Sequence, residues 1–446
     1  MLSPVRAPSQ EFPRVAIVGS GISGLAAAHA LRGKAEVTLF ESGSYFGGHT
    51  HTVDVTLTGP KGPVTHGVDT GFLVFNERTY PHLIALLAEL DVKTAKSDMS
   101  FSVQVPGAGR GGASLEWSGS SLNTVFSQRG NLLNWRFLRM LRDITRFNRI
   151  ANDLATSGAD AALMQPLGEF LQAQKLSDEF RDWYFLPMMG CIWSCPTDQM
   201  LQFPVSTMIR FCYNHGLIQV ANRPQWWTVS GGARHYVDKI TAQIHDKRLN
   251  TPVQAVVRDA DGVDIVTEGR SERFDKVVLA THSDQSLALL AEPSQQERQV
   301  LSAIRYQPNR AVLHTDASVL PANKLAWAAW NYERAPQTSR ESAQVCLHYL
   351  LNMLQPLPFS QDQPVLVSLN PLHDIPRNLI MGEFNYAHPV FDLAAIRAQQ
   401  GLPALQGRQH TFFCGAWTGY GFHEDGLKSG LAVAEQLAAK FAVQAE

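Results

Sequence analysis

The sequence predicts an α/β fold in which a Rossmann-like nucleotide-binding domain, assembled from separate segments, carries an inserted α+β domain. Three observations predict it. A β-α-β unit with a glycine-rich turn lies near the start, a strand, a loop and a helix end the chain, and long mixed segments separate them. The chain has 446 residues, 45% of them hydrophobic, so it can build more than one core.

Composition excludes several classes of protein. The formal net charge of −2 offers no electrostatic basis for binding nucleic acid, so we expect no nucleic-acid partner. We find no apolar run of the length a membrane span needs, and residues 1–14 lack the apolar centre of a secretory signal. The five cysteines fit a reducing compartment. We therefore expect a cytoplasmic protein, with peripheral contact at the inner membrane surface left open.

The β-α-β unit occupies residues 14–41. Residues 14–19, RVAIVG, form a β-branched apolar run typical of a parallel strand that is buried on both faces. Residues 22–33 have the pattern of a helix, which we expect Gly33 to cap, and residues 35–41 predict a second strand that ends at Glu41. The turn between strand and helix is therefore the candidate phosphate-binding loop.

The glycines of that turn have distinct expected roles. Gly19 permits the tight turn, Gly21 lets the backbone approach a pyrophosphate, and Gly24 lets helix and strand pack closely. The helix N-terminus favours the negative charge of the phosphates, and we count Ser23 in its first turn among the cofactor-binding residues. Glu41 is placed to bind a ribose diol. We therefore predict a bound dinucleotide.

A second copy of the same G-x-G-x-x-G pattern serves as an internal control. Gly107, Gly109 and Gly112 match it, but residues 101–105 and 113–117 alternate apolar and polar like two strands. No helix pattern follows directly. We therefore predict a hairpin loop there, without a nucleotide.

A second glycine pair, Gly47 and Gly48, follows the acidic residue in the stretch ESGSYFGGHT. Here the chain resembles the flavoprotein superfamily of amine oxidases, phytoene desaturases and protoporphyrinogen oxidase. The resemblance implies that this pair lies beside FAD, so FAD is the expected cofactor. Family members often carry Arg directly after the pair, where this chain has His49, so a fixed charge is replaced by a titratable one.

The C-terminal stretch TFFCGAWTGYGFHEDGLKSGLAVAEQLAAK matches the same family. It predicts a strand, a loop and a helix that we expect Asp425 to cap. The resemblance implies that Gly426 and Leu427 present backbone N–H groups to the flavin edge and that Gly415 approaches the ribityl–phosphate region. Cys414 lies in the predicted strand, so we expect FAD to be bound without a covalent link.

Three further segments extend the resemblance over nearly the whole chain. In HGVDTGFLVF, Thr70 and Gly71 correspond to the glycine-containing loop beside the flavin ring. Val253 falls where the family holds the adenine through backbone contacts. Gly231 and Gly232 mark either a turn into a helix below FAD or a plain glycine turn.

The resemblance also predicts a domain division, with a substrate domain made of a helical part and a sheet part. Residues 1–75, 226–285 and 405–446 should form the FAD-binding domain, and residues 76–225 and 286–404 the substrate domain.

The residue sequences of the motifs are most similar to those of a bacterial subgroup of predicted NAD/FAD-binding proteins associated with fatty-acyl modification. The resemblance implies an FAD-dependent oxidoreductase acting on a hydrophobic small molecule or lipid, by desaturation or double-bond isomerisation of a fatty-acyl chain. Two alternatives remain: a flavin amine oxidase, and a non-catalytic FAD-binding partner of a lipid-modifying enzyme. Amine oxidases guide the amine between two aromatic rings, and only Tyr420 and Phe422 lie near the equivalent loop.

Catalytic residues are not assigned by the sequence. His423, Glu424 and Tyr420 are candidates for acid–base work or for fixing the flavin ring, and the other interpretation is a solvent-facing loop.

Cys191, Cys195, Cys212 and His215 have the spacing C-x3-C-x16-C-x2-H, which lies outside the usual zinc patterns. Their neighbours are apolar, so we expect buried cysteines and no metal site.

Overall fold

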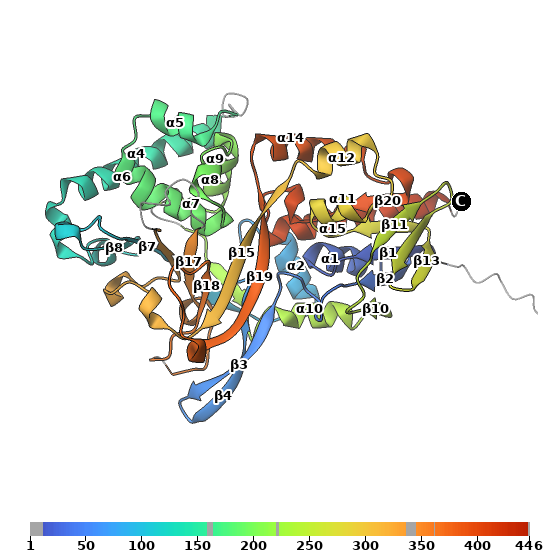
Figure 1. The fold of residues 1–446 in the computed structure, drawn as a ribbon, viewed down its shortest axis with the longest axis horizontal. Coiled ribbons are helices and arrows are strands. Elements are labelled where there is room, and N and C mark those ends of the chain that lie inside the picture. Colours follow the sequence, from blue (N-terminus) through green and yellow to red (C-terminus); the bar gives the residue numbers. More distant parts are fainter. Residues whose placement is uncertain (1–11, 158–163, 220–222, 336–344, 361, 445–446) are drawn as a thin grey trace, which may run out of the picture. The chain divides into compact units, whose positions relative to one another are not determined.

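The computed structural model describes residues 12–157, 164–219, 223–335, 345–360 and 362–444 (Figure 1). The chain forms two compact units. Unit 1 consists of Met1–Gly48, Val237–Ser302 and Gln399–Glu446, and unit 2 of His49–Tyr236 and Ala303–Ala398.

The units divide the chain at other positions than the predicted domains. Residues 49–75 and 226–236 fall in unit 2, because their hydrogen bonds are made there: Asp69 accepts from Ala233 and from Gln355. Residues 286–302 fall in unit 1, where the buried carboxylate of Glu297 pairs with Arg258. Segments near the expected boundaries therefore belong to the unit that contains their hydrogen-bond and ion-pair partners.

Unit 1 is built on a five-stranded parallel sheet with β1 at its centre. In spatial order its strands are β10 (Asp246–Arg248), β2 (Glu36–Phe40), β1 (Arg14–Val18), β14 (Lys276–Leu279) and β20 (Thr411–Phe413). Residues 15–18 are fully or almost fully buried, as expected of a central parallel strand. The helix α1 (Ile22–Ala30) connects β1 to β2, so the predicted β-α-β unit is confirmed.

The end of α1 differs from the prediction in one detail. The helix ends at Ala30 with Leu31 as its cap, and Gly33 lies two residues further on with a φ of +71°. Gly33 therefore closes the turn after the helix and is not the cap itself, because Leu31 remains in the right-handed helical conformation.

The remaining elements of unit 1 surround this sheet. The antiparallel strands β11 (Ala255–Arg258), β12 (Val263–Thr267) and β13 (Arg270–Phe274) precede β14 in the chain. The helices are α11 (Ser283–Leu289), α12 (Gln295–Leu301) and α15 (His423–Gln444). The helices α10 (Arg234–Thr241) and α14 (Leu393–Gly401) each run from one unit into the other.

Unit 2 contains a seven-stranded mixed sheet. In spatial order its strands are β19 (Ile380–Val390), β15 (Arg305–His314), β18 (Leu366–Leu369), β17 (Cys346–Leu350), β16 (Trp330–Glu333), β7 (Phe101–Val105) and β8 (Leu115–Ser118). Only the β16–β7 pair is parallel. The hairpin predicted around the second glycine pattern is confirmed, because β7 and β8 pair antiparallel on either side of it.

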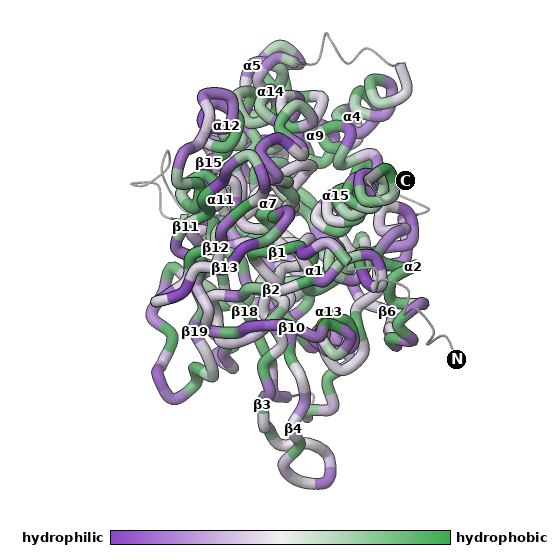
Figure 2. The backbone as a smooth tube through the Cα atoms, turned by 90° about the vertical axis from the view of Figure 1, so that its right-hand side faces the viewer, coloured by the Kyte–Doolittle hydropathy of each residue, from purple (hydrophilic) through white to green (hydrophobic). Residues whose placement is uncertain are grey.

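Two smaller sheets complete the strands of unit 2. The hairpin of β3 (Thr52–Gly59) and β4 (Gly62–Asp69) projects as an isolated loop in Figure 2. A three-stranded sheet contains β5 (Phe75–Asn76), β9 (Trp226–Val229) and β6 (Thr94–Ser97).

The helical part of the predicted substrate domain lies in its first segment, residues 76–225. Its helices are α2 (Pro81–Glu89), α3 (Leu122–Val125), α4 (Trp135–Ser157), α5 (Leu167–Ala173), α6 (Asp178–Phe180), α7 (Leu186–Trp193), α8 (Thr197–Met200) and α9 (Val205–Asn214). The short helix α13 (Leu351–Leu354) follows β17. A core of fully buried rings holds α4 to the neighbouring segment, including Phe137, Phe147, Phe180 and Phe185. Within the described ranges, no helix is both long enough and apolar enough to span a membrane.

Candidate functional site

The turn between β1 and α1 has no room for side chains at two of its three glycines. Gly19 has a φ of +100°, and a Cβ there would lie 2.9 Å from the carbonyl oxygen of Ala280. A Cβ on Gly24 would lie 2.0 Å from the carbonyl oxygen of Gly19. Helix and turn are therefore in backbone contact, as the pattern predicts.

Gly21 is in the opposite situation. A Cβ built on it would have no described protein atom within 4 Å, so the space before α1 is open on this side. Gly21 precedes the first residue of the helix, where backbone N–H groups and the helix dipole favour an anion. The open space and the helix terminus together provide a place for a phosphate group.

The Glu41 carboxylate organises the loop from the end of β2. Its Oε2 accepts hydrogen bonds from the backbone N–H of Ser20 (3.0 Å) and from Ser20 Oγ (2.6 Å), and its Oε1 accepts from the N–H of Gly43 (2.8 Å). The predicted ribose-binding residue therefore also holds the glycine turn in place, a role that the sequence analysis missed.

The second glycine pair lies against the first loop. The N–H of Gly47 donates to the carbonyl oxygen of Ser20 (3.1 Å), and Gly47 and Gly48 have φ values of +122° and +57°. A Cβ on Gly48 would lie 3.2 Å from the Cα of Gly21. The two loops thus form one glycine-lined surface, whose backbone can be approached closely.

The helix α15 packs directly on α1 through glycines. A Cβ on Gly426 would lie 2.8 Å from Ile22 Cγ2 and 2.9 Å from Ser23 Oγ, and one on Gly430 would lie 2.1 Å from the Ser23 carbonyl oxygen. Leu427 is fully buried beside them. The N-terminal turns of both helices therefore adjoin, and their dipoles favour negative charge in the same region.

Asp425 acts differently from the predicted cap. The helix α15 begins at His423, so Asp425 lies in its first turn and accepts from the N–H groups of Tyr420 and Phe422 (both 3.0 Å). This is the reaching-back half of a capping box. Burial raises the pKa of Asp425 to about 6, although the two N–H groups oppose the rise.

Two of the three catalytic candidates near Asp425 lie in a helix and not in a loop. His423 and Glu424 form the first residues of α15, and Glu424 is buried, so the alternative of a solvent-facing loop is wrong for Glu424. Tyr420 lies in the turn just before the helix, where its N–H is held by Asp425.

Gly415 and Val253 occupy the other predicted positions of unit 1. The N–H of Gly415 donates to Ser429 Oγ (2.9 Å), and a Cβ there would lie 2.4 Å from Trp417 Nε1. The buried Trp417 donates to the carbonyl oxygen of Thr281 (3.2 Å) and was missed by the sequence analysis. Val253 lies in the segment between β10 and β11, two residues after Thr251, whose N–H donates to the Glu41 carbonyl oxygen.

In unit 2, the structure brings together the predicted residues His49, Thr70 and Gly71. The carbonyl oxygen of His49 accepts from the N–H of Phe72 (2.8 Å), and a Cβ on Gly71 would lie 2.2 Å from that same oxygen. Thr70 precedes Gly71 and is buried. Gly71 is therefore required by the close approach of the chain at His49.

Thr70, His51 and Tyr386 form a hydrogen-bonded trio. Thr70 Oγ1 lies 3.0 Å from His51 Nδ1 and 2.8 Å from the hydroxyl of Tyr386, which lies 3.2 Å from His51 Nδ1. Burial lowers the pKa of His51, which favours the neutral form of its ring. The rings of His49 and Tyr386 lie 5.0 Å apart, centre to centre.

Asp69 is the most perturbed acid near this trio and was not predicted. It accepts from the N–H of Ala233 (2.9 Å) and from Gln355 Nε2 (2.8 Å), and burial raises its pKa to about 7. It ties β4 to Gly231 and Gly232, which form the predicted turn into α10 with φ values of +79° and +106°.

The cysteines of the possible zinc pattern are buried thiols. Cys191, Cys195 and Cys212 lie in or beside apolar helices, and His215 Nδ1 lies 2.9 Å from the carbonyl oxygen of Phe211. Burial lowers the pKa of His215 to about 4. These residues pack in the aromatic core, as the apolar interpretation expects.

Comparison with known proteins agrees with this geometry. The family model for flavin containing amine oxidoreductases matches residues 22–438. No curated protein matches the sequence significantly.

Solved structures share the fold at low identity. The CLA-producing fatty acid isomerase from P. acnes is 16% identical, covers 95% of this chain and 98% of its own, and superposes with a TM-score of 0.66. Cyclohexylamine oxidase from Brevibacterium oxydans IH-35A is 16% identical over 97% and 100% of the two chains, with a TM-score of 0.66. A putative protoporphyrinogen oxidase from Exiguobacterium sp. 255-15 is 17% identical over 97% and 99%, with a TM-score of 0.61.

These likenesses confirm the predicted fold class and the predicted resemblance. The glycine-lined loops and adjoining helix ends of unit 1 suit the pyrophosphate of a dinucleotide. Because the family match covers nearly the whole chain, the protein belongs to the flavin-containing amine oxidoreductases and uses FAD as its cofactor.

Proposed function

We propose that this FAD-dependent oxidoreductase acts on the fatty-acyl chain of a membrane lipid, by desaturation or double-bond isomerisation. The observation that carries the proposal is an apolar and basic surface on unit 2. We call it the Arg–Leu surface. Its members are the exposed residues Leu122, Arg129, Leu132, Leu133, Trp135, Leu138, Arg142 and Arg149.

Large apolar side chains are unusually exposed there. Leu133 is 91% exposed, Leu122 80% and Trp135 65%, and Leu132 and Leu138 are exposed as well. They come from α3, from a 3₁₀ turn at Arg129–Leu133 and from the start of α4. Clustered exposed apolar side chains mark a contact surface more often than scattered ones do.

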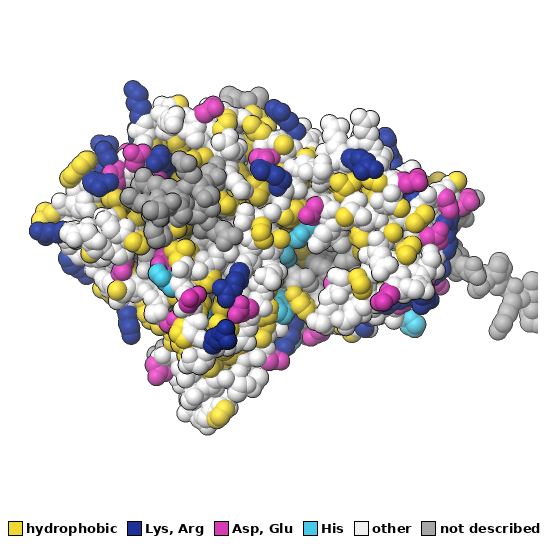
Figure 3. Space-filling model, viewed as in Figure 1, with side chains coloured by type: hydrophobic (Ala, Val, Ile, Leu, Met, Phe, Trp, Pro, Cys, Tyr) yellow, Lys and Arg dark blue, Asp and Glu magenta, His cyan; other side chains and the backbone are white. Residues whose placement is uncertain are grey.

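Arginines share the same face of α4. Trp135, Leu138, Arg142 and Arg149 follow one another at spacings of three, four and seven residues, so their side chains lie along one side of the helix. Residues 119–152 contain six arginines and one acidic residue, the buried Asp143. Two of these arginines, Arg136 and Arg139, pair with the buried Glu179. Figure 3 shows dark-blue and yellow side chains near one another along the rim where Figure 1 places α4, α6 and β8.

Apolar side chains flanked by arginines fit an anionic phospholipid surface. The apolar residues can enter the headgroup–acyl boundary while the guanidinium groups bind phosphate, and each cation near such a surface contributes about 1 kcal/mol. Contact of this kind would present a lipid chain to the enzyme, which a small soluble amine does not need.

The chemistry requires removal of a hydride and handling of a proton. When bound, FAD supplies the two-electron acceptor for the hydride. Loss of a hydride and a proton from adjacent carbons leaves a double bond, and the two electrons of the hydride pass on to an acceptor such as dioxygen. Return of the hydride at another carbon gives isomerisation without an external oxidant. His51, with Thr70 and Tyr386, is the group of this chain that we expect to hold the proton.

An amine oxidase activity is the second candidate, because cyclohexylamine oxidase has the same fold. The fatty acid isomerase from P. acnes, which also has this fold, supports the lipid proposal.

The test is an anaerobic visible spectrum of the purified protein with vesicles of phosphatidylglycerol that carry unsaturated chains. Bleaching of the oxidised flavin band, or a shifted double bond in the recovered lipid, is the result we expect. Cyclohexylamine and putrescine are tested in parallel. Bleaching by an amine with none by lipid, together with an unchanged lipid, would overturn the proposal in favour of an amine oxidase. An oxidised flavin that no compound reduces, with unchanged lipid, would favour the non-catalytic alternative.

The Arg–Leu surface is tested with a double variant, Leu133→Asp and Trp135→Asp. Both side chains are exposed, so the fold should persist, while sedimentation with the vesicles should fall at least about tenfold. The matched control is Val443→Asp, which changes an exposed apolar residue on α15. Equal vesicle binding by the wild type and the double variant would contradict a lipid-binding role for this surface.

A further inference from the structure

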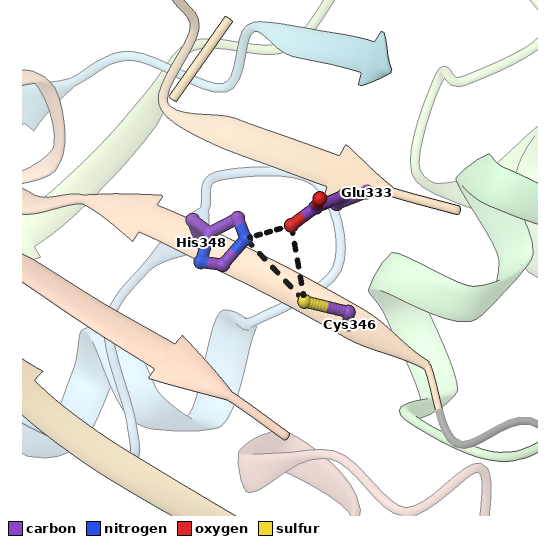
Figure 4. Close-up of side chains that lie close together, drawn as sticks. All are labelled: Glu333, Cys346 and His348. Atoms are coloured by element: carbon purple, nitrogen blue, oxygen red, sulfur yellow. Dashed lines mark hydrogen bonds and ion pairs between the residues drawn. The ribbon is translucent and has the colours of Figure 1, made fainter. Parts of the chain in front are cut away.

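Unit 2 buries three metal-binding side chains in the middle of its large sheet. Glu333 ends β16, and Cys346 and His348 lie on the neighbouring strand β17 (Figure 4). Glu333 is the cross-strand partner of Cys346, and His348 follows two residues later. Alternate residues of a strand face the same side, so the pairing brings all three side chains together.

The three donor atoms form a compact triangle. His348 Nε2 lies 3.2 Å from Glu333 Oε2 and 3.3 Å from Cys346 Sγ, and Cys346 Sγ lies 3.9 Å from Glu333 Oε2. Zinc holds nitrogen, oxygen and sulfur ligands at about 2.0–2.3 Å in a tetrahedron, so neighbouring ligands lie about 3.3–3.6 Å apart. The triangle has close to the size of one face of such a tetrahedron.

We propose that Glu333, Cys346 and His348 bind a zinc ion. Carboxylate, thiolate and imidazole are the ligand types that zinc takes in proteins. All three residues are buried, which distinguishes this group from the exposed acidic clusters that occur without a metal. The proposal does not depend on the flavin or on the lipid substrate.

The surroundings of the triangle support the assignment. His348 Nδ1 lies 2.6 Å from Ser368 Oγ, which lies 2.7 Å from His314 Nε2. A partner on the second ring nitrogen is what orients metal-binding histidines. Burial, followed by the neighbouring Glu333 carboxylate, raises the pKa of the Cys346 thiol, and a hydrogen bond with the backbone of Leu372 opposes that rise.

The loop that carries Leu372 also supplies a partner for Glu333. His373 Nε2 lies 3.0 Å from Glu333 Oε1, and the His373 side chain is 69% exposed. It therefore connects the Glu333 carboxylate with solvent. The donor atoms of the triangle all lie within 4.8 Å of one another and His373 is not among them, so we expect His373 to orient Glu333 and not to bind the ion itself.

A nucleophilic triad does not account for this arrangement. In a triad, the nucleophile and the acid contact opposite nitrogens of the histidine. Here Cys346 and Glu333 both face Nε2 of His348, and Ser368 occupies Nδ1. A cation that binds Cys346, Glu333 and His348 Nε2 together would explain why two groups face the same nitrogen. The competing explanation is a metal-free network, in which Glu333 accepts hydrogen bonds from both His348 and His373.

The test measures metal in the flavin-loaded protein after zinc is added and then dialysed against a weak chelator. We expect about one zinc ion per chain in the wild type. We expect none above background in Cys346→Ser, and full occupancy in the control Cys191→Ser, which alters another buried thiol of unit 2. Replacement by Co²⁺ should give a thiolate-to-cobalt absorption band that is absent from Cys346→Ser.

A second variant, His373→Ala, tests the proposal if Cys346→Ser fails to fold. The His373 side chain is exposed, so its removal should leave the fold intact. This variant should bind zinc at least about tenfold more weakly than the wild type. A wild type that retains no zinc, or an equal loss of zinc in Cys191→Ser and Cys346→Ser, would overturn the proposal. Vesicle binding and flavin content should not change in His373→Ala, so a failure here is distinct from a failure of the proposed function.

Discussion

Two loops of this molecule have the same G-x-G-x-x-G pattern and different structures. In unit 1, Gly19–Gly24 joins a buried parallel strand to α1, and its third glycine is pressed against the backbone. In unit 2, residues 107–112 join two antiparallel strands, and a Cβ on Gly112 would have no described atom within 4 Å. The flanking segments, and not the glycines, decide which structure forms.

At the second glycine of each pattern, the crowded and the open loop change places. Gly21 faces open space, whereas a Cβ on Gly109 would lie 2.7 Å from the carbonyl oxygen of Ser114. In the nucleotide-type loop the space beside the second glycine is open, as the predicted ligand requires, and in the hairpin the protein itself fills it. Substitutions at matched positions can therefore separate cofactor binding from folding.

The largest expected effect is at the third glycine. Gly24→Ala should destabilise the protein by about 3–5 kcal/mol and abolish flavin retention, because the new Cβ meets a backbone oxygen that cannot move alone. Gly112→Ala should cost only about 1–2 kcal/mol, for a left-handed backbone. Thermal unfolding and flavin content measure both. Similar losses in the two variants would break the comparison.

The next largest contrast is expected between substitutions of the acidic residues that follow the two loops, Glu41 and Glu116. Glu41→Gln replaces a carboxylate that accepts from Ser20 and Gly43, and we expect a loss of about 1.5–3 kcal/mol together with weaker FAD binding. Glu116→Gln disturbs a buried carboxylate that accepts from the N–H groups of Ala322 and Asn323. It should lower stability by a similar amount without changing FAD affinity. FAD titration followed by fluorescence distinguishes the two, and an equal fall in affinity would contradict the assignment.

The second glycines should show opposite effects. Gly21→Ala should leave the flavin-free protein as stable as before, or more stable by about 0.4–1 kcal/mol, because alanine restricts the unfolded chain. Its FAD affinity should fall about tenfold or more, a change of about 1.4 kcal/mol. Gly109→Ala should destabilise by about 1–3 kcal/mol and leave FAD affinity unchanged. Unchanged FAD affinity in Gly21→Ala would place the phosphates elsewhere.

Removal of FAD should have the smallest effect, and a local one. Hydrogen exchange should become faster at the amides of residues 20–25, which lose their ligand, and stay constant at residues 107–112. Mass spectrometry of peptides from the two loops measures the difference. Equal acceleration in both loops would show that the flavin stabilises the molecule globally.

The sequence predicted best where the determinants are local. The turn at Gly19, the strands around it and the hairpin at residues 101–118 each follow from a short stretch whose apolar pattern and glycines act on near neighbours. Asp425 was identified near a helix start but assigned to the wrong position, because the helix begins two residues earlier, at His423. Element boundaries depend on packing that a single segment does not contain.

The sequence by itself determined the family, the cofactor and the glycine loop, because close backbone approach and helix dipoles impose residue types at fixed spacing. Only the tertiary structure decided the rest. Tyr386 meets His51 across 335 residues, and strand pairing places Glu333 opposite Cys346. No periodicity links residues so far apart, because their contact arises from the register of a sheet and not from local geometry.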